Sequence, residues 1–450
     1  MLVLPLYTVV AALPALVMVL HIDSTSTTAA QSFWRLAAWA PVLVLVTLTI
    51  YAVMTVGAVA TLRRGIRPGL YAGATRVSYQ LWLVSRIVGS SRDVLAPLYG
   101  SMFTPWWLRR LGASIGRDAE VTTPVGLPWL LTVGDGSFIA DDVLFAPTSS
   151  WRGWLRIDRV VIGERSFIGN SAVLDSGTFV GDDALVAVAA VAPQVVRDTS
   201  SWLGNPALEI PRAHQRGSMA RTYAPGMGLK ALRASIEVVR GAVPLVTWVV
   251  TLGAIMAGLE SSMARFGLSG AVLLSPVVLA LAGGGAWLVT VALKWSVVGR
   301  YREDEHPLWS LNVWRDEFVT VMCEQIAGMW LVPYCAGTTI FNAYLRTLGA
   351  RVGRNVWCET WSMTEFDLVT LEDDAVIGPN SDLQTHLFHD RVLRTGAVLV
   401  GPRSTVATRS VLLPNTALHE GVVLYPRSLV MRGEVLGANS AWHGTPVIGR

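Results

Sequence analysis

A six-residue period runs through the C-terminal part of the chain. Apolar side chains recur on it at Val400, Val406, Leu412, Leu418, Leu424, Val430, Leu436 and Trp442. An α-helix repeats near 3.6 residues and a strand near 2, so neither places this column on one face. A triangular coil does so, because its short flat sides turn one side chain in six inward. The period is therefore typical of a parallel β-helix built from hexapeptide repeats, and we expect the left-handed form.

The same period occurs earlier in the chain. Its inward positions there are Ile162, Ile168, Leu174, Val180 and Val186. Glycine follows the inward residue at Gly163, Gly169 and Gly181, where a tight corner favours a residue without a Cβ. The sequence therefore predicts a second β-helix.

Composition indicates a membrane protein. Hydrophobic residues make up 52% of the chain, charged residues 15%, and the mean hydropathy is +0.46. The uncharged stretches 41–62 and 268–293 are each long enough to cross about 30 Å of hydrocarbon. The net charge of +4 is small and dispersed, so no nucleic-acid partner is expected. The three cysteines lack CxxC spacing, which favours neither a zinc site nor a disulfide; Cys358 lies on the six-residue period and is expected to pack inward.

Apolar stretches come in pairs, which predicts two transmembrane hairpins. We interpret 2–22 as a retained first helix, because no basic segment precedes it and no clear cleavage site follows. Arginines follow the second stretch at Arg63 and Arg64, whereas the loop between the stretches carries only Asp23 and Arg35. The positive-inside rule then places both β-helices in the cytoplasm of a bacterial cell, below a multi-pass inner-membrane anchor.

The predicted order of segments is the same in both halves. It comprises hairpin 1 (1–65), helical segment 1 (66–107), β-helix 1 (108–212), a basic linker (213–240), hairpin 2 (241–300), helical segment 2 (301–340) and β-helix 2 (341–450). The helical segments are rich in Trp, Tyr and Arg, which suits either a helix at the headgroup level or a helix that caps the β-helix.

The two halves match in sequence, which predicts a tandem duplication. LRRLGASIGR at 108–117 matches LRTLGARVGR at 345–354, and Ile162-Gly163 matches Val400-Gly401. The interval from Phe145 to Ile162 equals that from Leu383 to Val400, so one loop leaves each coil at the same height.

The loop at 383–398 gathers His386, His389, Asp390 and Arg391 on a scaffold whose coils otherwise show few ionisable groups. His386 has an ordinary pKa near 6.5 and could take a proton from an amine or hydroxyl that attacks an activated acyl group. We expect Asp390 to fix its tautomer and Arg391 to hold a phosphate or carboxylate. The first copy has Thr148 in place of His386, so we expect that β-helix 1 has no base. A structural role at the loop root remains the alternative.

Other histidines give weaker indications. His386 and His389 have the spacing of metal ligands, but no third ligand lies nearby in sequence, so no metal is predicted. His419 and His443 fall on coil corners and are expected to be solvated.

The hairpin and the motifs LRxLGAxIGR, IGxxxFIGNSAVLxxGT, SWLGNPA and LQTHLFxDRV resemble the membrane-bound carboxy-terminal region of ε-poly-L-lysine synthetase-like nonribosomal peptide synthetases. The resemblance implies tandem domains related to hexapeptide acyltransferases, which receive monomers as phosphopantetheine thioesters from adenylation and thiolation domains. It implies that His386 is the acyl-transfer base and that Gln384, Asp390 and Arg391 line the site. This chain departs in having His389 where an acidic residue is usual, and two repeated units where three are typical.

We therefore expect a membrane-bound acyltransferase that joins an amine to a pantetheine-linked acyl group, with His386 and Asp390 as catalytic residues. Gln384, His389 and Arg391 are expected to bind substrate. The donor would be a carrier-bound phosphopantetheine or a CoA thioester, and the expected partners are the membrane and a thiolation domain; homo-oligomerisation is left open. The alternatives are a catalytically silent scaffold for a synthetase or export route, and a CoA-dependent acetyltransferase acting on a membrane or cell-wall acceptor.

Overall fold

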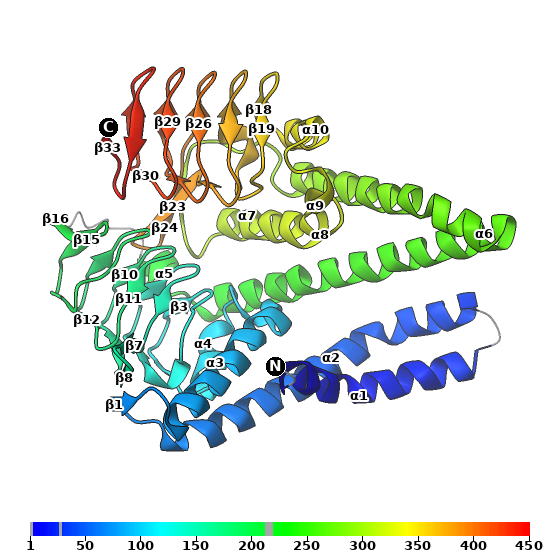
Figure 1. Cartoon of the computed structure of the whole chain (residues 1–450), viewed down its shortest axis with the longest axis horizontal. Helices are drawn as coiled ribbons and strands as arrows, with labels where there is room; N and C mark the ends of the chain where they lie inside the picture. The colour runs from blue at the N-terminus through cyan, green and yellow to red at the C-terminus, as the bar shows by residue number, and fades with distance from the viewer. Residues whose placement is uncertain (1–2, 27–28, 212–218) are drawn as a thin grey trace. The chain divides into compact units, whose positions relative to one another are not determined.

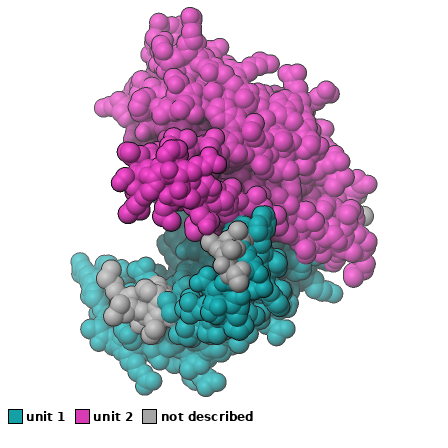
Figure 2. Space-filling view, turned by 90° about the vertical axis from the view of Figure 1, so that its right-hand side faces the viewer, with its two compact units in different colours: residues 1–214 teal, residues 215–450 magenta. Residues whose placement is uncertain are grey.

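The structure of the chain is a computed structural model, and it describes residues 3–26, 29–211 and 219–450. The chain divides into two compact units, residues 1–214 and 215–450 (Figure 2). In each unit, long apolar helices lead through a helical segment into a coil of very short strands (Figure 1). This shared order of elements supports the duplication that the sequence matches predict.

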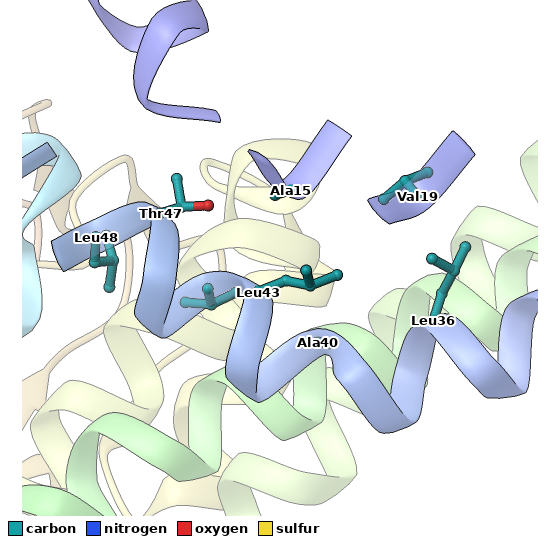
Figure 3. A pocket seen from close by; sticks show the side chains of 8 residues that line it. Ala15, Val19, Leu36, Ala40, Leu43, Thr47 and Leu48 are labelled. Carbon is teal, nitrogen blue, oxygen red and sulfur yellow. The ribbon is translucent and has the colours of Figure 1, made fainter. Parts of the chain in front are cut away.

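Unit 1 begins with two apolar helices, α1 (Val3–Ser24) and α2 (Ala29–Leu62). Both are long and apolar enough to cross a membrane. Between them lies an apolar cavity of about 430 Å³ (Figure 3). Its lining residues are Ala15, Val19, Leu36, Ala40, Leu43, Val44, Thr47 and Leu48. None of these side chains is ionisable, so the cavity offers no group for acid–base chemistry.

Unit 2 contains the third candidate span among the described residues, α6 (Met227–Val297), which follows the short helix α5 (Met219–Thr222). Gly267 has φ 67° and ψ −176°, which is not helical, so two helices meet there (Figure 1). The predicted second hairpin is therefore present as two arms. Within the predicted basic linker at 213–240, residues 227–240 are helical and continue into the first arm of α6; residues 212–218 lie outside the described part of the chain.

Short helices connect the spans to the coils. In unit 1 they are η1 (Arg63–Gly65), α3 (Arg76–Val94), η2 (Ala96–Leu98) and α4 (Thr104–Arg110), and in unit 2 they are α7 (Leu311–Met322), the π-helical turn Cys323–Ala327, α8 (Gly328–Trp330), α9 (Val332–Cys335) and α10 (Thr339–Leu348). Leu81, Val84 and Val88 of α3 pack in one cluster with Tyr51 of α2, whereas Trp82 is exposed. One face of α3 therefore packs against the protein, whereas the face that carries Trp82 does not.

Strands of unit 1 form parallel sheets on the faces of a coil. One sheet consists of β2 (Ser114–Ile115), β4 (Leu131–Val133), β9 (Val160–Ile162), β12 (Phe179–Val180) and β14 (Val195–Val196). A second consists of β3 (Glu120–Val121), β5 (Phe138–Ile139), β10 (Phe167–Ile168), β13 (Leu185–Val186) and β15 (Ser201–Leu203), with β16 (Leu208–Ile210) antiparallel at its end. The third consists of β6 (Leu144–Phe145) and β11 (Val173–Leu174).

Unit 2 repeats this arrangement. One sheet consists of β18 (Arg351–Val352), β20 (Val369–Leu371), β25 (Val398–Val400), β28 (Thr416–Leu418) and β31 (Val435–Leu436). A second consists of β19 (Trp357–Cys358), β21 (Val376–Ile377), β26 (Thr405–Val406), β29 (Val423–Leu424) and β32 (Ala441–His443), ending in the antiparallel β33 (Ile448–Gly449). The third consists of β22 (Asp382–Leu383), β27 (Val411–Leu412) and β30 (Leu429–Val430).

Pairing between coils confirms the parallel β-helix. Val411 pairs with Leu429 and Phe167 with Leu185, so a full turn takes 18 residues, or three hexapeptides. Inward residues such as Leu412 and Cys358 are fully buried, as the period predicts. The aliphatic column therefore forms the core of each unit.

The glycines of the first β-helix are needed for close approach between turns. A Cβ on Gly163 would lie 2.8 Å from the backbone N of Asp182, and one on Gly169 would lie 2.6 Å from the backbone N of Val188. Positive φ angles occur instead two residues later, at Arg165 and Ser171. A side chain at the glycines would thus force adjacent turns apart.

Each coil is interrupted at the same height by an antiparallel hairpin. In unit 1, β7 (Thr148–Trp151) and β8 (Trp154–Ile157) pair with β1 (Gly69–Ala72); in unit 2, β23 (His386–His389) and β24 (Val392–Thr395) pair with β17 (Glu305–Pro307). The predicted loop at 383–398 is therefore a hairpin. It is held by a strand from the segment that follows α6.

Candidate active site

His386 is the first residue of β23 and lies at the root of this hairpin. The preceding Thr385 is fully buried, whereas the His386 side chain is 28% exposed. The ring edge of His386 meets Phe388, with 6.1 Å between centroids and an interplanar angle of 76°. His386 therefore stands at the surface with one side of its ring against the protein.

Glu365 is the partner of His386. Its Oε1 lies 2.8 Å from Nδ1 of His386, and its side chain is fully buried. The hydroxyls of Thr364 and Thr385 donate to the other oxygen, Oε2, at 2.6 Å and 2.5 Å. Glu365 precedes η5 (Phe366–Leu368), a corner that comes just before β20. Three donors thus fix the carboxylate behind the imidazole.

The end of α6 fixes this corner. Lys294, which is fully buried, donates from Nζ to Oδ2 of Asp367 at 2.7 Å. The backbone N of Tyr301 donates to the same oxygen at 3.0 Å. Asp367 lies within η5, two residues after Glu365, so these contacts tie the position of Glu365 to the chain that leaves the span.

Burial and charge oppose each other at this pair. Burial alone would lower the pKa of His386, but the Glu365 carboxylate raises it to about 10. Burial alone would raise the pKa of Glu365, but the His386 charge and the hydrogen bonds it accepts hold this pKa well below its usual value. The resting state near neutral pH is therefore an ion pair of imidazolium and carboxylate.

The other ring nitrogen, Nε2, is the one available to a substrate. The hydrogen bonds that His386 makes with described residues involve Nδ1, on the side of the ring that faces Glu365, and the side chain is 28% exposed. When the ring is neutral, Nδ1–H donates to Glu365 and Nε2 carries the lone pair. This is the tautomer that a general base requires.

Two further side chains complete the buried face. Asp316 of α7 lies beside the pair, and one ligand atom from each of Asp316, Glu365 and His386 falls within 4.8 Å of the others. The carboxyl of Asp316 and the hydroxyl of Tyr301 have raised pKa values, because both are buried and face further acidic groups. These donor types could hold a divalent cation such as Zn²⁺. However, both Glu365 oxygens already accept hydrogen bonds, as in a proton-sharing cluster.

The expected partner of His386 was placed wrongly in the sequence interpretation. Asp390 lies at the hairpin tip and contacts His389, with 3.4 Å between Oδ2 and Nε2. Four residues of extended strand, at about 3.3 Å each, separate it from His386. Glu365 takes the role assigned to Asp390.

Other predicted binding residues lie around this hairpin. Arg391 is 1% exposed; its Nη1 donates to the carbonyl of Thr222 at 2.9 Å, and its guanidinium stacks on Tyr223. It holds the start of unit 2 rather than facing a substrate. Gln384 lies between β22 and β23, two residues before His386, and donates from Nε2 to Oδ2 of Asp382 at 2.7 Å. Its predicted role in substrate binding stays a prediction.

Unit 1 has apolar residues at the equivalent positions. The hairpin strands and the N-caps of the short helices give the equivalent positions in the two units. Ile66 corresponds to Tyr301, Leu81 to Asp316 and Leu127 to Glu365. The three residues of unit 1 pack in one core cluster. Thr148 stands in place of His386. Glu365 and Asp316 were missed from the sequence, although an alignment of the two halves pairs Glu365 with Leu127.

Comparisons with known proteins agree with the motifs. No protein-family model matches the chain. The chain is 34% identical over 385 residues to Delta-poly-L-ornithine synthetase of Acinetobacter baumannii (strain AB307-0294). The match covers 84% of this chain and 29% of that protein, so the chain spans less than a third of its relative's length.

Solved structures with partial similarity include a maltose O-acetyltransferase from Clostridium difficile 630, at 15% identity and a TM-score of 0.23 over 33% of this chain and 94% of that one. They also include a serine acetyltransferase from Neisseria gonorrhoeae, at 17% identity and a TM-score of 0.22 over 46% and 90%. A third is a galactoside acetyltransferase in complex with coenzyme A, at 13% identity and a TM-score of 0.27. That similarity covers 33% of this chain and 88% of the other one. The resemblance predicted from the motifs is confirmed by the curated match: over most of its length, the chain is a relative of the poly-amino-acid synthetases.

Proposed function

We propose that the chain is a membrane-bound acyltransferase in which His386 removes a proton from an amine that attacks an acyl thioester. The observation that carries this proposal is the His386–Glu365 pair, with Nδ1 held by a buried carboxylate and Nε2 directed away from it. The relative named as a poly-L-ornithine synthetase supports an amine as the acceptor. β-helix 1, with Thr148 in place of the base, acts as a structural partner.

In the proposed reaction, the amine nitrogen attacks the carbonyl carbon of the thioester. The C–N bond forms, and the N–H proton passes to Nε2 of His386. Collapse of the tetrahedral intermediate breaks the C–S bond, and the imidazolium returns the proton to the leaving sulfur, which departs as a thiol. Glu365 orients the ring and stabilises the imidazolium that forms. Because the resting ion pair already holds a proton, the step requires the neutral fraction of His386.

The donor in this proposal is a pantetheine-linked aminoacyl group carried by a separate thiolation domain. A CoA thioester presents the same pantetheine arm and is the competing donor. Gln384 and His389 then stay candidates for substrate binding, whereas Asp390 is buried at the hairpin tip.

Activity in purified chain tests the proposal directly. Thiol release is followed with aminoacyl-pantetheine, an aminoacylated carrier domain and acetyl-CoA as donors and a diamine as acceptor. We expect turnover with the first two donors in the parent and not in His386→Ala. Turnover with acetyl-CoA alone would favour the acetyltransferase alternative. Full activity in folded His386→Ala would refute the role of this histidine, and no turnover with any donor would favour the silent scaffold.

The proposed location is the bacterial inner membrane with both β-helices in the cytoplasm. Arg63 and Arg64 follow α2, and Arg300 follows α6, which supports this orientation. We expect a cysteine at Ser24 to react with an impermeant thiol reagent in intact cells and a cysteine at Thr199 to react only after lysis. The reverse pattern would invert the orientation. A variant without the native cysteines provides the background.

A further inference from the structure

Asp316 is a buried carboxyl that the β-helix fold does not require for its packing. It is 8% exposed, and its Oδ1 is buried without a hydrogen bond of ordinary geometry in the described chain. It faces Glu365, His386 and the hydroxyl of Tyr301, which is also buried. Such a group costs free energy unless something compensates for its burial.

The charge balance indicates which carboxyl carries a proton. Two carboxylates this close in a buried site do not both stay ionised. Glu365 accepts hydrogen bonds from His386, Thr364 and Thr385, all of which favour its ionised form. Asp316 has one such donor, the hydroxyl of Tyr301, and its other close neighbour is the Glu365 carboxylate, which favours the protonated form of Asp316. Its neutral form leaves one negative charge, on Glu365, opposite one positive charge, on His386.

Unit 1 shows that this part of the fold packs well without polar groups. Leu81 and Leu127 fill the positions of Asp316 and Glu365, and both belong to a continuous apolar core. Exchanging a buried polar cluster for packed apolar residues is often neutral or stabilising. The carboxyl of Asp316 is therefore explained by the site it faces rather than by stability.

We propose that Asp316 is a positioning residue of the His386 site, which faces Glu365 as a neutral carboxylic acid and donates its proton toward it. This inference rests on the proposed function for its kinetic consequence only. A neutral donor at this place limits the negative charge behind His386 to one and keeps Glu365 turned toward Nδ1. Asp316 touches neither donor nor acceptor.

Kinetics of Asp316→Leu and Asp316→Asn test the proposal. We expect Asp316→Leu to fold and to lower kcat by about 10- to 100-fold with little change in KM, the usual scale for losing a group that orients another. Asp316→Asn also presents a neutral donor, so it should restore kcat to near the parent and leave the alkaline rise of the pH profile in place. Asp373→Asn, at an exposed acid paired with Arg354, is the control. A pH profile displaced downward in Asp316→Asn would show an ionised Asp316 and overturn the proposal.

Two measurements on full-length protein do not depend on activity. Infrared difference spectra of parent and Asp316→Asn near neutral pH should contain the C=O band of a protonated carboxylic acid, and a carboxylate band in its place would overturn the proposal. Elemental analysis of the purified parent provides the second measurement. A stoichiometric divalent metal that Asp316→Asn loses would assign the cluster to a metal site and overturn it as well. If the parent transfers no acyl group, the proposed function fails, while the infrared result still decides the state of Asp316.

Discussion

Replacing Glu365 by glutamine should move the pH dependence of acyl transfer. In the parent, His386 accepts a proton only in its neutral form, so kcat/KM should rise with pH toward a pKa of about 10. The amide oxygen of the introduced glutamine can still accept the Nδ1–H hydrogen bond, but the substitution removes the charge that raises this pKa. Burial then opposes only the smaller contributions of Asp316 and Asp382, so the rise should move down toward the ordinary histidine pKa of about 6.5.

The size of this effect follows from the ion pair. A pKa of about 10 in place of 6.5 corresponds to about 5 kcal/mol of extra stabilisation of the imidazolium over the neutral ring. Near neutral pH, about one His386 in a thousand is then neutral in the parent, and most are neutral in Glu365→Gln. The variant should lose activity at high pH, where orientation of the ring limits the rate. It should retain more of its maximal rate at low pH than the parent does.

The assay measures thiol release between about pH 6 and about pH 10.5, with spontaneous thioester hydrolysis subtracted. A weakly basic acceptor, such as an aromatic amine, keeps the acceptor's own protonation outside this range. Asp373→Asn again provides a variant with one acid fewer at an exposed site. Coincident profiles for the parent and Glu365→Gln, or a parent profile that rises near pH 6.5, would refute the reasoning.

Three further predictions follow from the same contacts. His386→Ala should lower turnover by about 10²- to 10⁴-fold, whereas Thr148→Ala should stay within a few-fold of the parent; equal losses would contradict a single site. Lys294→Met leaves Asp367 buried without its cation and should lower the free energy of unfolding by about 3–5 kcal/mol. Denaturant unfolding in detergent measures this change, and an unchanged midpoint would contradict the contact. Because the pKa of His386 is raised in the folded state, the ion pair stabilises fully below pH 6.5 and its contribution is lost as pH rises through about 10; Glu365→Gln should flatten this decline in the melting temperature.

The fold could be predicted largely from sequence because its signal is local and repeated. Each inward residue, such as Val406 or Leu424, lies six positions from the next, and pairing between turns follows from that spacing. The kink at Gly267 and the helical start of α6 were less accessible. They depend on how two arms of one helix meet rather than on the hydropathy of either arm.

The site could be predicted only in part because its members come from three distant segments. His386 was found from a cluster of polar residues, and the same cluster suggested Asp390. In a strand, however, neighbours in sequence point apart or lie far along the hairpin, and the tip is occupied by Asp390 and His389. The true partner, Glu365, precedes a corner of the coil one turn away, in a stretch with no histidine or cysteine to mark it.

The contrast between the two units separates what the fold requires from what the site requires. Both units keep the aliphatic column, the hairpin and its third strand, so these features belong to the architecture. At the root of the hairpin, unit 1 packs Ile66, Leu81 and Leu127 in a continuous core. Unit 2 buries two carboxyls and a tyrosine at these places, next to a histidine whose side chain is 28% exposed. Because such a cluster is costlier to bury than leucine, chemistry at His386 is the simplest reason for it.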